Sequence, residues 1–549
     1  MTAAAAVALV IGASPAAAAR LSMSNAARTY VEARAAAMSG DHSRAAQLLA
    51  TLAQAQPDQA DIARKALSEA VGAGDMNLAI NLSRAVPAAK LPVEARLLLA
   101  TESVRRHHPE RAGQWLGATG DNGDLTFLAP LITAWSAAER GDAQQALSAF
   151  DQIPARSLLS PVEAEQQAFI LLRFRRAAEA EPLARQAVGR AGARETQLRL
   201  ALADAFLAAG DKPRALMIVE GMGAGEAAAR QRINAGKSGG QAIDSSLKAL
   251  SEVLTAFATD LMRLQPGSPP IGLVQVARYA NPQNNSATAL LALLLAGQGR
   301  SSEALALLRS VPPNDALTSQ VRDVEVRILR DQKNNNEAYR VAAAAASSPN
   351  ADVGDYSRFG DVLQSMNRYN EAADAYGRAI AFAQAQKLDS QLWSLLLLRA
   401  GSLEEANRWP EARAALQQAL TLAPDQPLLL NFLGYAKLER GEDMDAAEAM
   451  IRKASDLAPD EASITDSLGW AQFKRGKVDE AIATLQRAAE KDPAQAEIQE
   501  HLGDALYRSG RRYEARFAWN AALVTAEDAI ELRVKAKLAS GLTPANAAP

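Results

Sequence analysis

The chain of 549 residues contains no cysteine, few aromatic residues and no excess of positive charge. The lack of cysteine excludes disulfides, cysteine-ligated zinc, iron–sulfur clusters, thiol catalysis and a lipid-modified N-terminal cysteine. Lys and Arg together number 59 against 62 Asp and Glu, and the formal net charge is −3. Because nucleic-acid-binding proteins usually carry a strongly basic surface, we expect no nucleic-acid partner.

Long apolar runs are also missing after the first twenty residues. The most apolar later stretch, residues 289–296, is far shorter than the ~20 residues that span a membrane, and it predicts a buried helix. Residues 1–19 combine an uncharged apolar stretch with small residues before Arg20, although no Lys or Arg precedes Arg20. This pattern is typical of a secretory signal peptide and predicts export to the periplasm. The alternative is an Ala-rich disordered tail on a cytoplasmic protein.

Patterns typical of catalytic or cofactor sites are missing too. Residues 236–238 read Gly-Lys-Ser, like the end of a phosphate-binding loop, but Gln231 stands where the first glycine belongs and no strand is predicted before it. No histidine has the spacing of a metal site, and we interpret all four as surface or structural residues: His42, His107, His108 and His501. We therefore expect no catalytic residue, no metal, no cofactor and no enzyme activity.

The sequence does contain a repeated unit. In its C-terminal third, a Leu-Gly pair, a second Gly and two Ala recur with starts at Leu433, Leu468 and Leu502, which are 35 and 34 residues apart. The spacing matches the ~34-residue helix–turn–helix of tetratricopeptide repeats. On this pattern the chain is identified as a member of the tetratricopeptide superfamily. The fold class that follows is all-α, a superhelical solenoid of roughly a dozen helix pairs.

Two positions of the repeat have a clear structural reason. The second Gly is expected to end the first helix in the left-handed conformation, where Asn is the next best residue. A Gly or Asn stands five residues before an Ala at Gly40, Gly74, Gly141, Gly210, Gly299, Asn367, Asn407, Gly476 and Gly510. The Gly of the Leu-Gly pair, such as Gly434, is expected where the two helices of a unit cross, because only a small residue lets the backbones approach closely.

The pattern divides the chain into six parts. Residues 93–116, 164–189 and 317–346 keep a helical apolar periodicity without the glycine and are predicted to be degenerate units. The predicted parts are a signal peptide (1–19), an N-terminal array (20–220), a Gly-rich loop or hinge (221–245), degenerate repeats (246–350), a C-terminal array (351–525), and a solvent-facing capping helix with a tail (526–549).

The first helices of such an array line a concave groove, and side chains there that do not pack are candidates for partner binding. In the C-terminal array these candidates are Asn431, Tyr435, Glu439, Asp466, Trp470, Phe473, Lys474, Asp504, Tyr507 and Arg508. Aromatic residues with mixed charges are common in binding hot spots. The alternative is that Trp470, Phe473 and Tyr507 pack between neighbouring units, and periodicity does not separate the two. Trp519, on a second helix, is predicted to be core.

A narrower resemblance covers about residues 393–523. The segments 430–435 (LNFLGY), 466–470 (DSLGW) and 501–507 (HLGDALY), with Glu514-Ala515-Arg516 and Trp519, resemble one group of bacterial envelope repeat proteins. The best understood member of that group is an outer-membrane lipoprotein that binds a carboxyl-terminal processing protease and helps present peptidoglycan hydrolases to it. The resemblance implies these two classes of protein as partners. This chain differs in having no cysteine for lipid attachment.

The sequence therefore predicts a non-catalytic scaffold or adaptor for other proteins of the bacterial cell envelope. Two alternatives stay open. One is a scaffold for polysaccharide synthesis or secretion, as in other long periplasmic arrays. The other is a small-ligand carrier or enzyme formed by the irregular segment 221–285.

Overall fold

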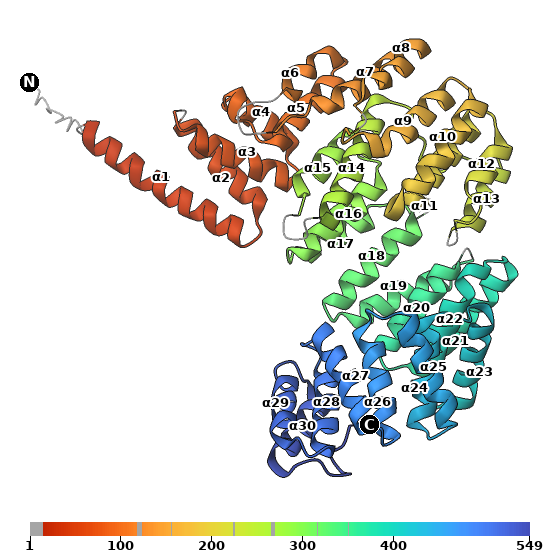
Figure 1. The fold of residues 1–549 in the computed structure, drawn as a ribbon. Helices are drawn as coiled ribbons and strands as arrows, with labels where there is room; N and C mark the ends of the chain where they lie inside the picture. The colour runs from red at the N-terminus through yellow and green to blue at the C-terminus, as the bar shows by residue number, and fades with distance from the viewer. Residues whose placement is uncertain are drawn as a thin grey trace, which may run out of the picture. The chain divides into compact units, whose positions relative to one another are not determined.

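A computed structural model of the chain describes residues 15–56, 58–117, 123–154, 156–222, 225–264, 269–313, 315, 317–349 and 351–548. These residues form α-helices and short 3₁₀-helices and contain no strand, which confirms the all-α prediction (Figure 1). Most of the predicted signal peptide, residues 1–14, lies outside the described residues, and residues 15–19 begin helix α1. The chain divides into two compact units, Met1–Asn350 (unit 1) and Ala351–Pro549 (unit 2).

The helices of unit 1 include many antiparallel neighbours, such as α2 with α3 and α9 with α10. They are α1 (Pro15–Met38), α2 (His42–Ala55), α3 (Ala60–Ala73), α4 (Met76–Ser83), α5 (Val93–Arg105), α6 (Gly113–Leu116), α7 (Ala129–Glu139), α8 (Ala143–Ser148), α9 (Ser160–Arg173), α10 (Ala177–Arg190), α11 (Glu195–Ala208), α12 (Lys212–Ile218), α13 (Glu226–Asn234), α14 (Ser246–Leu264), α15 (Ile271–Ala280), α16 (Asn285–Gly297), α17 (Ser301–Arg309), α18 (Thr318–Asp331) and α19 (Asn335–Ala346). The 3₁₀-helices are η1 (Ala88–Lys90), η2 (Pro109–Arg111), η3 (Thr126–Leu128), η4 (Phe150–Gln152) and η5 (Gly192–Arg194).

The helices of unit 2 pack as consecutive pairs, α20 with α21, α22 with α23, α24 with α25, α26 with α27, and α28 with α29. A last helix, α30, packs on both α28 and α29. Their bounds are α20 (Val353–Ser365), α21 (Tyr369–Ala385), α22 (Asp389–Glu405), α23 (Trp409–Leu422), α24 (Pro427–Glu439), α25 (Met444–Leu457), α26 (Ala462–Lys474), α27 (Val478–Lys491), α28 (Ala496–Arg508), α29 (Arg512–Ala522) and α30 (Asp528–Ser540). This order of stacked pairs is that of a repeat solenoid.

The predicted left-handed residues are confirmed. All nine Gly and Asn positions have φ between 58° and 90°. At the end of α26, the N–H of Gly476 donates to the carbonyl of Phe473 and the N–H of Lys477 to that of Gln472, each at 2.9 Å. These paired bonds satisfy carbonyl groups that the helix end would leave free.

The degenerate units close their first helices in the same way without glycine. His107, Arg175 and Lys333 have φ of 60°, 59° and 57°. The N–H of Lys333 donates to the carbonyl of Arg330 at 2.8 Å, and the N–H of Asn334 to that of Leu329 at 2.9 Å. A side chain in this conformation costs roughly 1–2 kcal/mol, so the packing of the surrounding helices maintains the turn where the sequence lacks its glycine.

The small residues at the helix crossings are confirmed as well. A Cβ atom on Gly434 would lie 2.7 Å from Cγ1 of Ile451 and 3.0 Å from the carbonyl oxygen of Ala447. A Cβ atom on Gly469 would lie 2.6 Å from Cγ of Leu485. The carbon–carbon distances of 2.7 and 2.6 Å are too short for non-bonded atoms, so any larger residue would push the two helices of the repeat apart.

Helices α14 and α15 depart from a simple linear array. They pack against α3, α5 and α7, which precede them by more than a hundred residues (Figure 1). The N–H of Ser246 donates to Glu139 at 2.7 Å, and the Tyr279 hydroxyl donates to Glu102 at 2.6 Å. Periodicity indicates helices here but carries no information about such distant contacts. The array of unit 1 is therefore partly covered by its own chain.

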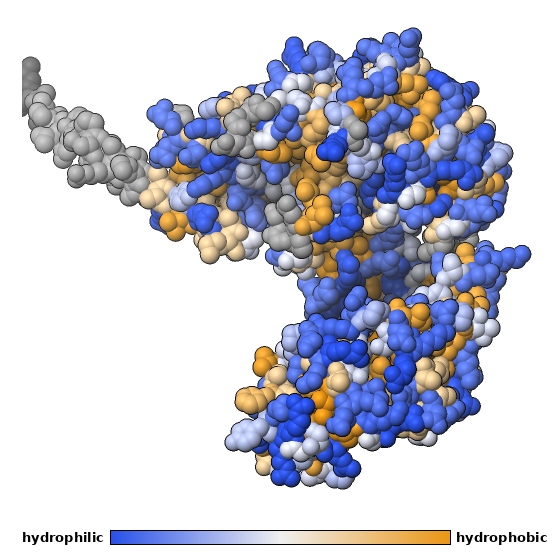
Figure 2. Space-filling model, viewed as in Figure 1, coloured by the Kyte–Doolittle hydropathy of each residue, from blue (hydrophilic) through white to orange (hydrophobic). Residues whose placement is uncertain are grey.

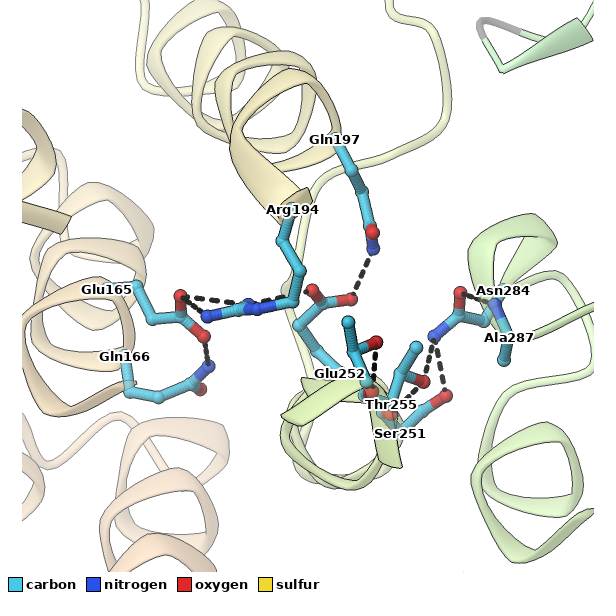
Figure 3. Close-up of polar contacts among 10 residues, drawn as sticks. Glu165, Gln166, Arg194, Gln197, Ser251, Glu252, Thr255, Asn284 and Ala287 are labelled. Atoms are coloured by element: carbon cyan, nitrogen blue, oxygen red, sulfur yellow. Dashed lines mark hydrogen bonds and ion pairs between the residues drawn. The ribbon is translucent and has the colours of Figure 1, made fainter. Parts of the chain in front are cut away.

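A buried polar cluster joins these layers of unit 1 (Figure 3). The guanidinium of Arg194 lies 3.2 Å from Glu165 of α9 and 3.4 Å from Glu252 of α14. Gln197 donates a further hydrogen bond to Glu252 at 2.7 Å. Burial raises the pKa of Glu252 to about 7, because the single cation Arg194 is shared by two carboxylates and compensates only part of the desolvation.

The segment 221–245, for which the sequence predicts a loop or hinge, contains the helix α13 and lies inside unit 1. The glycines stand at both ends of the segment, and Gly225 (φ 83°) precedes the helix. Between them the residues are mainly Ala, Arg and Gln, which favour helix. Ala229 and Ile233 are buried, so α13 is anchored by an apolar face.

Hydrophilic residues cover most of the surface visible in Figure 2, with apolar residues scattered between them. Isolated apolar residues of this kind are normal on protein surfaces.

Candidate protein-binding site

The first helices of three consecutive repeats lie side by side in unit 2, because α26 contacts both α24 and α28. All ten predicted binding residues lie on these three helices. Their partner helices α25, α27 and α29 pack on them through the glycine and alanine crossings. We call the side of α24, α26 and α28 that carries the predicted residues the inner face.

Trp470 forms the centre of the inner face but is itself buried. Its side chain is 1% exposed and stacks between two rings, Phe473 at 4.9 Å and His501 at 4.1 Å between centroids. The sequence left open whether Trp470 contacts a partner or packs between neighbouring repeats. In the structure it packs between neighbouring repeats. A partner would contact this ring only if something that covers it moved. Trp519 is fully buried, which confirms the prediction that it is core.

His501 is a structural histidine of the same cluster. Its Nδ1 lies 2.9 Å from Oδ2 of Asp466, and both side chains are buried. Burial alone would lower the pKa of His501, but the charge and hydrogen bond of Asp466 outweigh it and raise the pKa. The pair links α26 to α28 and fixes the ring that stacks on Trp470.

Acceptor atoms without partners line the inner face beside this cluster. Oδ1 of Asn431, Oε1 of Glu439 and Oδ1 of Asp466 are buried and have no hydrogen-bond partner among the described residues. We call these three atoms the acceptor row. Such orphaned acceptors are uncommon, since a buried polar atom left unpaired costs about 1–3 kcal/mol. N–H donors from outside the chain would satisfy the acceptor row if the groups that cover these atoms moved aside.

The charges around the acceptor row are mainly negative. Burial first, and then the nearby carboxylates of Glu439, Glu497 and Asp466, raise the pKa of Tyr435 well above its usual value. A cation, Lys474, lies beside the row, with its Nζ 3.7 Å from Oε1 of Glu439 and 5.5 Å from the centre of the Trp470 ring. An exposed lysine of this kind can move to accommodate a ligand.

The end of the inner face is closed by α30. Lys537 of α30 is fully buried and donates to Glu500 at 2.6 Å and to Asp504 at 2.7 Å. Arg533 donates a second pair of bonds to Glu500 at 3.0 and 2.7 Å. The sequence predicted that the capping helix faces solvent. This prediction is wrong for the side of α30 that carries Lys537. Val534 is also buried there, so the helix packs as the next first helix of the array would.

The structure separates the predicted binding residues into two groups. Asn431, Tyr435, Glu439, Phe473, Lys474, Tyr507 and Arg508 are at least partly exposed, whereas Asp466, Trp470 and Asp504 are buried. Asp504 accepts the indole N–H of Trp519 at 2.9 Å as well as the bond from Lys537. The binding role of all ten residues stays a prediction.

His501, Lys537 and Arg533 are parts of this site that the sequence did not single out. His501 immediately precedes a Leu-Gly pair, which is a recognisable position of the repeat. Lys537 had no such signal, because it lies after the last repeat and its partners are more than thirty residues earlier.

No group of three or more His, Cys, Asp or Glu side chains in the described parts of the chain is arranged to hold a metal ion. No helix there has the length and apolar character needed to cross a membrane.

Comparison with known proteins identifies the repeat. Family models described as tetratricopeptide repeat match residues 358–427 and 397–462, and one described as TPR repeat matches residues 469–510. A comparison with curated protein sequences found no significant match.

Several solved structures are similar to the chain in fold. The APC/C hetero-tetramer Cut9–Hcn1 is 15% identical, with 94% of this chain and 96% of that chain covered and a TM-score of 0.38. Yeast Tom70 is 13% identical, with 94% and 96% covered and a TM-score of 0.32. YrrB, described as a TPR protein with an unusual peptide-binding site, is 19% identical, with 36% and 97% covered and a TM-score of 0.27.

Proposed function

We propose that this chain, which contains tetratricopeptide repeats at residues 358–462 and 469–510, is a non-catalytic scaffold that binds a partner protein on the inner face of unit 2. Arrays of these repeats generally act as protein-interaction scaffolds, because stacked helix pairs present an extended binding surface. The acceptor row is the observation that supports this location.

The acceptor row also indicates how a partner would bind. An extended segment offers main-chain N–H groups at regular intervals, and a basic side chain offers several N–H donors at one point. Either would supply hydrogen bonds to the three acceptor-row atoms, which accept none in the described part of the chain. Binding would then gain about 1–3 kcal/mol for each orphaned acceptor satisfied.

The cellular place that we propose is the bacterial envelope. It is supported by the signal-like residues 1–19 and by the resemblance of residues 393–523 to envelope repeat proteins. Within the envelope, we propose that the chain recruits a carboxyl-terminal processing protease to cell-wall hydrolases. This finer proposal rests on the resemblance alone, since function lies in sites and is not fixed by a fold.

The adaptor role is tested by adding the purified chain to the purified protease and a peptidoglycan hydrolase. The proposal expects faster hydrolase cleavage with the wild-type chain and a weaker effect with Glu439→Lys, which reverses a charge of the acceptor row. The matched control is Glu490→Lys, an exposed carboxylate on α27, away from the inner face. Equal cleavage with and without the wild-type chain would contradict the adaptor role. A surface-polymer defect in a deletion strain without protease association would favour the polysaccharide alternative.

A further inference from the structure

The segment that follows α30 folds back onto the inner face. This segment, residues 541–548, has no charged side chain and consists of small and apolar residues apart from Thr543 and Asn546. It is folded as a turn, in which the N–H of Thr543 donates to Oδ1 of Asn546 at 2.7 Å and Nδ2 of Asn546 donates to the carbonyl of Gly541 at 2.9 Å. We call it the C-terminal segment.

The beginning of the C-terminal segment lies directly on Tyr507. Gly541 has a φ of 83°, and a Cβ atom there would collide with the Tyr507 hydroxyl. Glycine is therefore required at this position both for its backbone conformation and for the close approach. The next residue, Leu542, packs on the apolar cluster that includes Phe473 and Tyr507.

The end of the C-terminal segment covers the centre of the inner face. The N–H of Ala548 donates to Oδ2 of Asp504 at 3.2 Å. The Ala548 side chain is 5% exposed and belongs to the buried cluster of Trp470, Leu438 and Ala471. Four of the ten predicted binding residues, Phe473, Trp470, Asp504 and Tyr507, thus share a hydrogen bond, a packing cluster or a direct contact with the C-terminal segment.

The attachment of the C-terminal segment is limited to its two ends. Its middle residues Thr543, Pro544 and Ala545 are exposed, and the segment itself forms no ion pair within the described residues. Helix α30 differs, because Lys537 and Arg533 fix it to α28 by four charged hydrogen bonds. Segments with few buried apolar contacts open at a lower free-energy cost than the core. The C-terminal segment can therefore detach while α30 stays in place.

We propose that the C-terminal segment is an internal occupant of the partner-binding face, and that the partner is an extended, uncharged protein segment with small side chains that displaces it. This proposal rests on the inner face being the partner-binding surface. The partner segment donates a main-chain N–H to Asp504 and places a small residue on Trp470. It then continues toward the acceptor row of α24 and α26.

The C-terminal segment adds to the burial of Trp470 and Asp504, which the neighbouring rings and Lys537 also cover. If the binding face is covered in most molecules, the apparent dissociation constant equals that of the uncovered face divided by the fraction of molecules in which the face is uncovered. If the segment is detached in about one molecule in ten, a partner binds about tenfold more weakly to the intact chain than to an opened one.

The test uses the full-length chain and a synthetic peptide with the sequence of residues 541–548 (GLTPANAA), fluorescently labelled at its N-terminus and amidated at its C-terminus. Ala548→Glu places a charged side chain at the buried position and detaches the segment. Ala545→Glu makes the same substitution at an exposed position of the same segment and serves as the control. Binding is measured by fluorescence anisotropy, and folding by the thermal melting curve.

The proposal expects at least tenfold tighter peptide binding by Ala548→Glu than by the wild type or Ala545→Glu. If Ala548→Glu does not fold, Asn546→Ala, which removes both hydrogen bonds of the turn, is expected to bind more tightly in its place. Equal binding by all variants, or no binding by a folded open variant, would overturn the proposal. If the protease partner still depended on Glu439 in that case, the proposed function would stand and only the internal occupant would be rejected.

Discussion

Gly434, Gly469 and Gly503 lie where the first helix of a repeat crosses the second. A Cβ atom on Gly503 would collide with the Trp519 ring, just as one on Gly469 would collide with Leu485. The second helices of these three repeats carry Ala447, Ala481 and Ala515, all fully buried. The two helices of each repeat can therefore approach closely because the first helix has a glycine and the second helix has a buried alanine.

Gly469→Ala is expected to destabilise unit 2 by about 1–3 kcal/mol, because the added methyl group overpacks the crossing of α26 and α27. The control is Gly377→Ala in α21, where the nearest atom to the new Cβ, on the Arg399 guanidinium, is 3.8 Å away. That substitution is expected to be neutral or to stabilise by up to about 1 kcal/mol through helix propensity. Urea unfolding of both variants measures the difference. Equal stability of the two would mean that the crossing is not tightly packed.

Trp470→Ala is expected to lower the unfolding free energy of unit 2 by about 3–5 kcal/mol, since it empties the space between Phe473 and His501. Lys474→Ala, one turn away and exposed, is the control and is expected to change stability by less than about 0.5 kcal/mol. Chemical unfolding monitored by circular dichroism distinguishes the two. Unchanged stability of Trp470→Ala would show that the ring does not act as core.

Residue patterns predicted some of these features and not others. The left-handed Gly and Asn positions follow from a local backbone requirement, so each could be assigned from a few neighbouring residues. The burial of Trp470 could not, because its cover comes from His501 in the next repeat and from Ala548 beyond the last one. Surface and core aromatics have the same periodicity along a helix, and only the distant chain decides between them.

At the scale of helices, the C-terminal repeats were the best predicted part of the chain. Helices α24 to α29 follow the Leu-Gly, Gly and Ala pattern directly. The positions of α14, α15 and α30 were not predictable in this way, because their partners lie far away in the sequence. Lys537 illustrates the reason, since its burial depends on Glu500 and Asp504 and not on any feature of α30 itself.

The buried cluster of α9, α11 and α14 makes a prediction about pH. A carboxyl group whose pKa rises from 4.5 in the unfolded chain to about 7 in the folded chain favours folding only while it is protonated. The stability of unit 1 should therefore fall as pH rises from 4.5 through 7, by up to about 3 kcal/mol from Glu252 alone. Glu165 has its pKa raised by burial as well, with the same sign, and Arg194 is the one cation shared by both.

Glu252→Gln is expected to remove most of this pH dependence and to raise the melting temperature of unit 1 above that of the wild type at pH 8. Glu220→Gln, an exposed carboxylate of the same unit, should keep the wild-type slope. Differential scanning calorimetry between pH 5 and 8 measures all three proteins. A wild-type stability that rises over this range would contradict the assigned protonation of Glu252.

At the scale of the molecule, each of the two units contains buried apolar clusters of its own. A large cluster of buried residues lies within unit 1, from Ala33 to Ile328, and four other clusters lie within unit 2. A core of its own is the physical requirement for independent folding. The sequence indicated an array boundary at residue 351 but gave more weight to the glycines near residue 221.

Residues 351–549 expressed alone are therefore expected to fold, with a helical circular dichroism spectrum and a single cooperative melting transition. Residues 1–350 are expected to do the same. A fragment that ends with α27, such as 351–490, is the control and should melt less cooperatively, because it loses α28 to α30 and exposes the buried face of α26 and α27. Non-cooperative melting of the intact unit 2 would show that its core is incomplete without unit 1.

The most direct test of partner binding on the inner face is site-specific photo-crosslinking in the native cell. A photoreactive amino acid replaces Lys474, which is exposed beside the acceptor row, or Phe517, which is 73% exposed on α29. The account predicts a discrete crosslinked protein from position 474 that is absent from position 517 and weakened by Glu439→Lys. The same crosslinks from both positions, or none from position 474, would contradict a binding site on the inner face of unit 2.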